Sequence, residues 1–390
     1  MKRPIGRLAV GGGMFTALFA MSSLAHADYA DDGPETTTTT DLPPSTDGGA
    51  TGGSVVVPNG TGPYPLLVTT HGFSGASANQ LGWATHFASY GFVVVVPSLP
   101  NTFSPNEDVD AAIIEDLAAA YSDPPSSSPA FGKVDGTRIG LEGHSAGGLA
   151  TTMASSVINP AATVLFDPVD NGGVGVGDVP KLCSPLLEIF ADPSSCNNSE
   201  GWDAAKARSK GDQIQFHVVG ATHCDGENAV QGICSATCGA ASTARQDEFA
   251  RYATAFFLAY LKGDATAKAA ITDSALAADT AISGPSVVAG TNCDGSSGTG
   301  GDGGVSSDGG ASLRDGGSSS GGGDGGGTSA DGSTGGNGNE NGAAPGSGSS
   351  SSGCSCTSAG RASDRQSAYF TGLAAIGLLV ARRRSKKTNR

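Results

Sequence analysis

The residue most able to do chemistry is Ser145, which lies in a short glycine-rich segment, residues 143–148, with the sequence Gly-His-Ser-Ala-Gly-Gly. A β-branched and apolar run precedes it at residues 137–141, and a run with helical spacing follows it at residues 149–157. A serine between a strand and a helix sits on a sharp turn, where glycines without a Cβ atom avoid clashes. Its hydroxyl lies at a helix N-terminus, which favours developing negative charge. The pattern predicts a nucleophilic serine.

A serine nucleophile needs a base, and one of the six histidines has a suitable place. Where a serine is presented on such a turn, the acid and then the histidine follow it along the chain. Four histidines do not follow Ser145: His26, His71, His86 and His144. His217 lies within a predicted strand, residues 213–219, and reads as a packed or edge side chain. His223 lies in the loop after that strand and is therefore the predicted base.

The acid that orients the histidine has more than one candidate. Asp167 follows the apolar run 162–166, and Asp192 follows the run 185–191. Both therefore lie at the carboxyl end of a predicted strand, where parallel sheets gather active-site groups. Asp170 is a third candidate. Because Asp beside Pro is also a common turn or cap residue, the pattern alone leaves the choice open.

The elements that must position these residues alternate between strands and helices. Strands are predicted at residues 65–70, 92–96, 137–141, 162–166, 185–191 and 213–219, and helices at 77–90, 107–121, 149–157 and 243–261. Such alternation predicts an α/β fold, in which a mainly parallel, doubly wound sheet is covered by helices on both faces. Residues 54–265 form one predicted domain, with no separate lid domain.

The N-terminal part of the chain reads as a leader and a spacer. Residues 1–27 combine a basic start, an apolar middle and the sequence Ala-His-Ala, which together predict a secretory signal peptide. Residues 28–53 are rich in Thr, Pro, Asp and Gly and are predicted to be a disordered lead. The chain is thus expected to be exported.

The C-terminal part reads as a tether and an anchor. Residues 266–284 are a short extension, and residues 285–353 are a Gly/Ser/Asp-rich segment predicted to be a disordered linker. Residues 354–390 contain two cysteines, a short apolar run and an arginine cluster. This tail resembles the C-terminal sorting tail of myxobacterial surface proteins, which implies display on the cell surface and membrane contact through the tail alone.

The net charge limits the possible binding partners, and the cysteines indicate disulfide bonds. The formal net charge of -15 argues against nucleic acid and anionic lipid as partners. Six cysteines lie in or near the predicted domain: Cys183, Cys196, Cys224, Cys234, Cys238 and Cys293. Export favours disulfides, and six cysteines allow 15 pairings. We expect Cys224 to bridge to Cys196 and so to stiffen the loop of His223. No metal or cofactor is expected, because Cys234 and Cys238 lack a second matching ligand pair.

Several segments together resemble a known family. They are Thr-His-Gly-Phe at residues 70–73, Gln-Leu at 80–81, the apolar segment 88–97, the serine segment 143–148, and Phe-Asp-Pro-Val-Asp at 166–170. Over residues 54–262 the chain resembles plant-type chlorophyllases, within the α/β-hydrolases that include platelet-activating-factor acetylhydrolases and cutinase-like polyester hydrolases. The resemblance implies an α/β-hydrolase fold and a carboxylic-ester hydrolase.

The resemblance also implies roles for individual residues. In the chlorophyllase pattern the Asp-Pro-Val-Asp motif carries the acid, which corresponds to Asp167; in cutinase-like enzymes the acid follows the next strand, near Asp192. We favour Asp167. The oxyanion hole would use the backbone N–H of Ala146 and, by the family pattern, that of Phe73. Ala146 in place of a larger residue, together with export, argues against chlorophyll as the substrate.

These expectations combine into a secreted or surface-displayed serine esterase, monomeric in its hydrolase domain, that cleaves small-molecule or polymeric esters through an acyl-enzyme. The alternative is a non-catalytic surface binding or adhesion protein on a hydrolase fold. The first is favoured because Ser145, His223 and the segments expected to form the oxyanion hole are all present.

Overall fold

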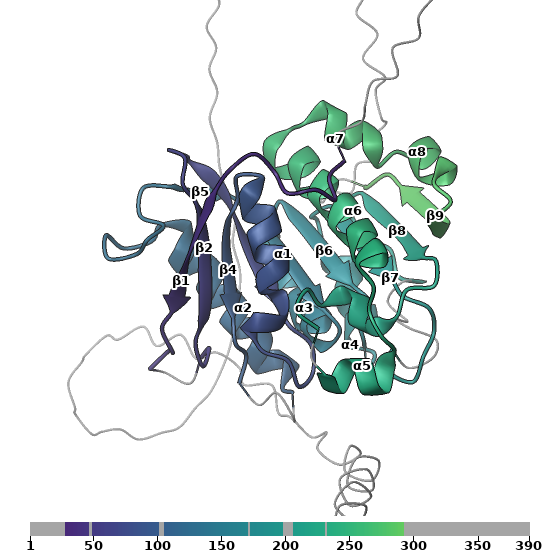
Figure 1. Ribbon diagram of the computed structural model, residues 1–390, viewed down its shortest axis with the longest axis horizontal. Helices are drawn as coiled ribbons and strands as arrows, with labels where there is room; N and C mark the ends of the chain where they lie inside the picture. Colours follow the sequence, from purple (N-terminus) through teal and green to yellow (C-terminus); the bar gives the residue numbers. More distant parts are fainter. Residues whose placement is uncertain are drawn as a thin grey trace, which may run out of the picture. The chain divides into compact units, whose positions relative to one another are not determined.

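A sheet of nine strands organises the part of the chain that the computed structural model describes, residues 28–46, 49–100, 105–170, 172–197, 206–230 and 232–291 (Figure 1). The strand order is β1-β2-β4-β3-β5-β6-β7-β8-β9. Six strands run parallel: β3 (Tyr64–Thr70), β4 (Val93–Pro97), β5 (Val134–His144), β6 (Ala162–Phe166), β7 (Leu186–Phe190) and β8 (Gln213–Val218). Three pair antiparallel towards the edges: β1 (Thr37–Leu42), β2 (Gly53–Pro58) and β9 (Ile282–Val288). The predicted α/β fold with a mainly parallel sheet is confirmed.

Helices cover both faces of this sheet (Figure 1). Helices α1 (Ser77–Ser89) and α6 (Thr243–Lys262) pack on one face, and α2 (Glu107–Ser122) and α3 (Ala146–Ile158) on the other. Every residue of β4 is buried, as expected for a parallel strand covered on both sides. The six parallel strands and the four helices α1, α2, α3 and α6 therefore lie where the apolar patterns of the sequence predicted them.

Aromatic side chains fill the space between the sheet and the α1–α6 layer. Trp83 meets Phe166 edge to face with ring centres 5.4 Å apart, and Phe249 meets Phe166 in the same way at 5.2 Å. Such arrangements stabilise a core beyond the area that they bury. Phe166 is the last residue of β6, so this packing fixes the strand end from which Asp167 projects.

The N-terminal lead is not a disordered spacer, contrary to the prediction. Strand β1 pairs with β2 along its whole length and forms an edge of the sheet, and Tyr29 is buried in the core. The sequence hides this strand because its Thr-rich run has little apolar character. Threonine is β-branched and suits an edge strand with one face in water, once β2 offers backbone partners.

The C-terminal boundary of the folded part also differs from the prediction. Short helices α7 (Ala265–Ala270) and α8 (Asp273–Ala278) lead into β9, which pairs with β8. The linker predicted from residue 285 therefore begins too early. Gly284 and Pro285 conceal the strand in the sequence, but an edge strand accepts proline because one side of its backbone makes no ladder bonds.

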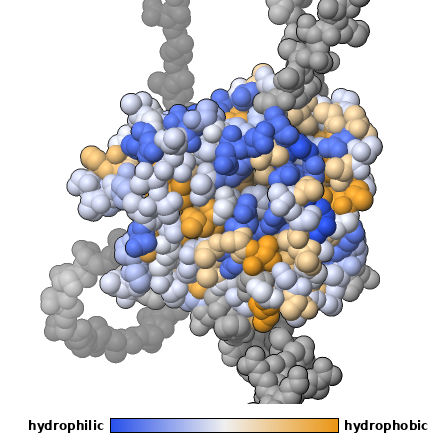
Figure 2. Space-filling model, viewed as in Figure 1, coloured by the Kyte–Doolittle hydropathy of each residue, from blue (hydrophilic) through white to orange (hydrophobic). Residues whose placement is uncertain are grey.

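The predicted signal peptide, most of the linker and the sorting tail lie outside the described residues. Within the described ranges, no helix is both long enough and apolar enough to cross a membrane. Figure 2 shows a largely hydrophilic face with several small hydrophobic patches, one of them in its lower part near the position of α5 in Figure 1. Helix α5 (Gly232–Cys238) carries Ile233, which is 51% exposed.

Candidate active site

Ser145 occupies the turn between β5 and α3, as predicted from the flanking patterns, with φ 56° and ψ -124°. A Cβ atom on Gly143 would lie 2.3 Å from Thr151 Oγ1, and one on Gly147 would lie 2.4 Å from the carbonyl oxygen of His71. Only glycine fits at either position. The strained serine backbone is held by this close packing, which leaves the hydroxyl beside the first turn of α3.

A chain of two hydrogen bonds joins Ser145, His223 and Asp167. Ser145 Oγ lies 2.9 Å from His223 Nε2, and His223 Nδ1 lies 2.6 Å from Asp167 Oδ2. Because a carboxylate accepts hydrogen bonds, Nδ1 carries the proton and Nε2 is left to accept from the serine hydroxyl. All three side chains are buried. The structure thus brings together three residues that lie far apart in the sequence.

The carboxylate of Asp167 is itself held in place by the neighbouring loop. Its Oδ1 accepts the backbone N–H of Ala191 at 3.0 Å, and Asn197 Nδ2 donates to its Oδ2 at 3.2 Å. The same amide nitrogen donates to the carbonyl oxygen of Asp192 at 3.0 Å. Asn197 was not identified from the sequence, since an asparagine in a polar loop gives no signal of its role.

The other two candidate acids have different partners. Asp192 is exposed, and its backbone N–H donates to the carbonyl oxygen of Ala221 at 2.9 Å, which ties the loops after β7 and β8 together. Asp170 accepts the backbone N–H groups of Val174 at 3.0 Å and Val176 at 3.3 Å. It therefore holds the start of the short helix α4 (Val174–Asp178), which leads into the 3-10 turn η1 (Val179–Lys181).

His144 contacts His223, the candidate base, through a hydrogen bond and through its ring. Its Nε2 lies 2.9 Å from the carbonyl oxygen of His223, and the two rings are 4.7 Å apart. Burial, and then the neighbouring His223, lower the pKa of His144 to about 3. The ring is therefore neutral, and its Nε2–H donates to the carbonyl group. The sequence excludes His144 as the base because it precedes Ser145, and it gives no sign of this contact with His223.

The histidine loop, defined here as residues 222–227, is anchored by a buried aspartate. It contains the 3-10 turn η3 (His223–Gly226). Asp225 is fully buried and accepts the backbone N–H of Thr222 at 2.7 Å, that of Ser242 at 2.7 Å and Arg245 Nε at 2.6 Å. These bonds tie His223 to the start of α6, so the position of the imidazole depends on a second element.

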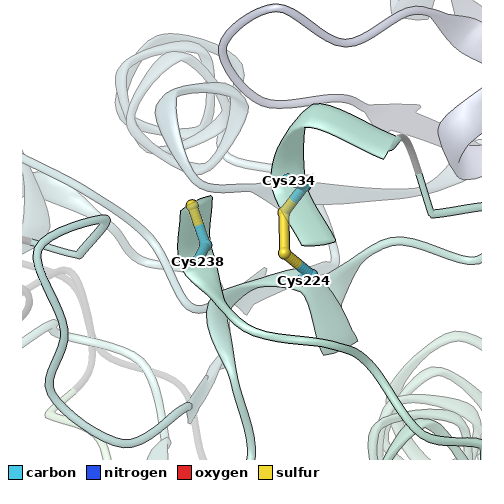
Figure 3. A group of neighbouring side chains, drawn as sticks. All are labelled: Cys224, Cys234 and Cys238. Atoms are coloured by element: carbon cyan, nitrogen blue, oxygen red, sulfur yellow. A yellow bond between two sulfur atoms is a disulfide. The ribbon is translucent and has the colours of Figure 1, made fainter. Parts of the chain in front are cut away.

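Two disulfides reinforce the same region, but not in the predicted pairing. Cys224 bonds to Cys234 on α5, as Figure 3 shows, and Cys196 bonds to Cys238. The predicted bridge from Cys224 to Cys196 is wrong. Helix α5 brings two cysteines close to the histidine loop, and Cys224 takes the one ten residues away in sequence. Only the path of α5 decides between these partners.

The three cysteines drawn in Figure 3 also have the proximity of metal ligands, with sulfur atoms within 4.8 Å of one another. A zinc site requires thiolates. The sulfur atoms of Cys224, Cys234 and Cys238 are all in disulfide bonds, so this group serves as a covalent clamp.

The loop after β3 passes directly beside Ser145. His71 Nε2 accepts the backbone N–H of Leu99 at 2.9 Å, which leaves the proton on Nδ1, 2.9 Å from the carbonyl oxygen of Gly72. Burial lowers the pKa of His71, which keeps the ring neutral. A Cβ atom on Gly72 would lie 2.6 Å from the Cβ of Ser145, so glycine lets this loop approach the nucleophile.

A small cleft lies between this loop and the start of α3. Its lining includes Gly72, Phe73, Ala146 and Gly147. Both residues expected to supply oxyanion donors, Phe73 and Ala146, thus border the same cleft. Ala146 is the first residue of α3, and an N–H group at that position has no carbonyl partner within its helix.

Comparisons with known proteins agree with this fold. Residues 33–190 match the model of the chlorophyllase family. The matched segment includes Ser145 and Asp167 and ends before Asp192 and His223. No curated protein matches the chain. The chain therefore has an α/β-hydrolase fold and, over residues 33–190, similarity to chlorophyllases that supports a hydrolase.

Proposed function

We propose that the chain is a serine hydrolase of carboxylic esters, with Ser145 as nucleophile, His223 as general base and Asp167 as the orienting acid. The observation that carries the proposal is the pair of hydrogen bonds at 2.9 Å and 2.6 Å that joins these side chains. This arrangement of a nucleophile, a base and an acid that fixes the tautomer is the one that acyl transfer through serine requires.

Acylation follows from the direction of these bonds. Ser145 Oγ attacks the ester carbonyl carbon while its proton passes to His223 Nε2. The carbonyl π electrons move to oxygen, giving a tetrahedral oxyanion. When the oxyanion collapses, the carbon–oxygen bond to the alcohol breaks and Nε2–H protonates the leaving alkoxide. The acyl group remains on Ser145. Asp167 stabilises the transient imidazolium without taking its proton.

Deacylation repeats the sequence with water. His223 Nε2 removes a proton from a water molecule as its oxygen attacks the acyl carbon, and the same proton then returns to Ser145 Oγ as the carboxylic acid departs. In both halves the oxyanion would accept hydrogen bonds from the backbone N–H groups of Ala146 and Phe73. One such donor is typically worth about 10²–10³ in rate.

We also propose that the enzyme acts outside the cytoplasm, on small or polymeric esters. The disulfides Cys224–Cys234 and Cys196–Cys238 support this location, because disulfides persist in oxidising compartments. The signal peptide at residues 1–27 and the sorting tail at 354–390 remain part of the proposal. N-terminal sequencing of protein recovered from the outside of producing cells tests it, with cleavage after Ala27 as the expected result.

The test of the catalytic proposal is Ser145→Ala. Hydrolysis of p-nitrophenyl butyrate and labelling by a fluorophosphonate probe should both disappear while circular dichroism stays unchanged. Ser156→Ala is the matched control, because Ser156 lies on the same helix and its hydroxyl donates to the carbonyl oxygen of Met153, away from His223 and Asp167 among the described contacts. A folded wild-type protein without hydrolysis or labelling would contradict the proposal and favour a surface binding protein.

A further inference from the structure

A buried carboxyl group that the proposed mechanism does not use lines the cleft beside Ser145. Asp110 lies in the first turns of α2, is 6% exposed, and borders the same cleft as Gly72, Phe73 and Ala146. Its Oδ1 is buried without a hydrogen-bond partner. Burial without a partner costs free energy, so an unpartnered carboxyl at a cleft needs an explanation.

The helix dipole favours an acidic residue in the first turn of α2, but Asp110 does not cap the helix. The N-cap of α2 is Asn106, whose side chain accepts the backbone N–H of Val109 at 3.3 Å, so the helix start is already capped. The backbone N–H of Asp110 donates to the carbonyl oxygen of Asn106 at 2.9 Å, which any residue would do. The side chain is therefore not needed to begin the helix.

The described side chains of the cleft wall offer Asp110 no cationic partner. The lining includes the apolar residues Leu99, Pro100 and Pro105 and, among the described residues, no lysine or arginine. His71 is the other titratable group there, and its two ring nitrogens face the N–H of Leu99 and the carbonyl oxygen of Gly72.

Charges outside the cleft reinforce this imbalance. Burial, and then Glu107, raise the pKa of Asp110 to about 7. Glu107 in turn feels the carboxylates of Asp108 and Asp170, which contribute to raising its own pKa after the effect of burial. An ionised Asp110 therefore has carboxylates nearby and no cationic side chain in the described cleft wall, so the ligand group that complements it is a cation.

We propose that Asp110 binds an ammonium group of the substrate, so that the preferred substrates are esters carrying a positive charge close to the scissile bond. This inference rests on the proposed esterase function and adds the substrate class. The ammonium group donates a hydrogen bond to, or pairs with, the carboxylate of Asp110 and so holds the ester beside Ser145. The apolar part of the cleft wall contacts the carbon atoms of the substrate.

Two pairs of isosteric esters test the charge alone. Butyrylcholine and 3,3-dimethylbutyl butyrate differ by a cationic nitrogen in the alcohol, and p-nitrophenyl 6-aminohexanoate and p-nitrophenyl heptanoate differ by an ammonium group in the acyl chain. At pH 8 the wild-type protein should favour the charged member of at least one pair by about tenfold or more in kcat/KM, a typical worth for one charged contact.

Asp110→Asn should bring that ratio to about one, whereas Asp108→Asn should keep it. Asp108→Asn is the matched control because it removes the same charge from an exposed position on the same helix. The inference is overturned if the wild-type ratio is already near one in both pairs, or if Asp110→Asn retains it.

A binding measurement separates this inference from the proposed function. Choline, but not 3,3-dimethylbutan-1-ol, should raise the Tm of the Ser145→Ala protein by about 2–4 °C at saturation, and Asp110→Asn should abolish the shift. Hydrolysis of the neutral esters with no charge preference and no choline shift overturns the inference alone. No hydrolysis of any ester, with the choline shift intact, overturns the proposed esterase and leaves the cation site.

Discussion

The histidine loop and the cleft wall, both near Ser145, each contain a buried aspartate, and the two aspartates differ in their hydrogen-bond partners. In the histidine loop, Asp225 accepts hydrogen bonds from Thr222, Ser242 and Arg245, and a disulfide adjoins it at Cys224. In the cleft wall, Asp110 is also buried, with 6% of its surface exposed, yet its Oδ1 has no partner. One carboxylate is enclosed by donors and the other faces a cleft.

The difference separates two uses of buried charge. A paired and hydrogen-bonded carboxylate makes a single geometry favourable, which suits a loop that must hold an imidazole within reach of a hydroxyl. An unpaired one lowers stability and leaves an interaction to be completed by a ligand. Removing a paired carboxylate should therefore damage the protein, and removing the unpaired one should stabilise it.

The largest effect is expected for Asp167, the paired carboxylate closest to the chemistry. Asp167→Asn should lower kcat by about 10⁴-fold, because an amide donor at this position holds the imidazole in the wrong tautomer. Steady-state kinetics with p-nitrophenyl butyrate measure it. Asp192→Asn should leave the rate within about threefold, since exposed substitutions usually change energies by about 0.5 kcal/mol or less. The reverse ranking would identify Asp192 as the acid.

The next effect concerns the anchor of the histidine loop. Asp225→Ala should lower the free energy of unfolding by about 3–5 kcal/mol, because Arg245 loses its buried carboxylate partner and the backbone N–H groups of Thr222 and Ser242 lose their acceptor. Urea denaturation measures this change. Asp116→Ala, at an exposed position on α2, is the control and should have little effect. A loss as small as the control's would mean that the loop does not depend on Asp225.

The disulfides should separate stability from activity. The chain-entropy model gives a loss of about 3 kcal/mol for removing Cys224–Cys234 and about 4 kcal/mol for Cys196–Cys238, since the second closes the longer loop, with a separation of 42 residues against 10. Activity below the unfolding transition should fall more in the Cys224→Ser/Cys234→Ser variant, because that bridge adjoins His223. Equal activity losses would show that the bridge does not position the histidine.

The smallest expected effect is that of Asp110→Asn, which should stabilise the protein. Asp110 has a pKa raised from 3.8 to about 7, so its carboxyl costs no stability below pH 4, where both states are protonated. The cost grows between pH 4 and 7 as only the unfolded state ionises, and it persists above pH 7. Asp110→Asn should therefore raise the free energy of unfolding at pH 8 and leave it nearly unchanged near pH 3. We expect a gain of about 1–2 kcal/mol, less than the roughly 4 kcal/mol that the pKa shift alone would give, because the amide that replaces the carboxyl is also buried. Destabilisation at pH 8 would mean that Asp110 has a structural role.

The six parallel strands and the main helices could be predicted because their signals are local. The valines of β4 and the apolar spacing of α6 are properties of consecutive residues, as is the strand–turn–helix around Ser145. Edge strands β1 and β9 could not be predicted, because half of each faces water and their stability comes from a partner strand. The prediction that Cys224 pairs with Cys196 was wrong for a related reason, since the pairing depends on where α5 lies.

The sequence by itself determined the alternating fold, the serine on its turn and the order in which an acid and a histidine follow it, because each is encoded in a short run of residue types. The tertiary structure alone decided which carboxylate meets His223, which cysteines join, and that Asp110 is buried beside the cleft without a partner. These are contacts between side chains distant along the chain. Their energies depend on separation and burial in three dimensions, which no local pattern specifies.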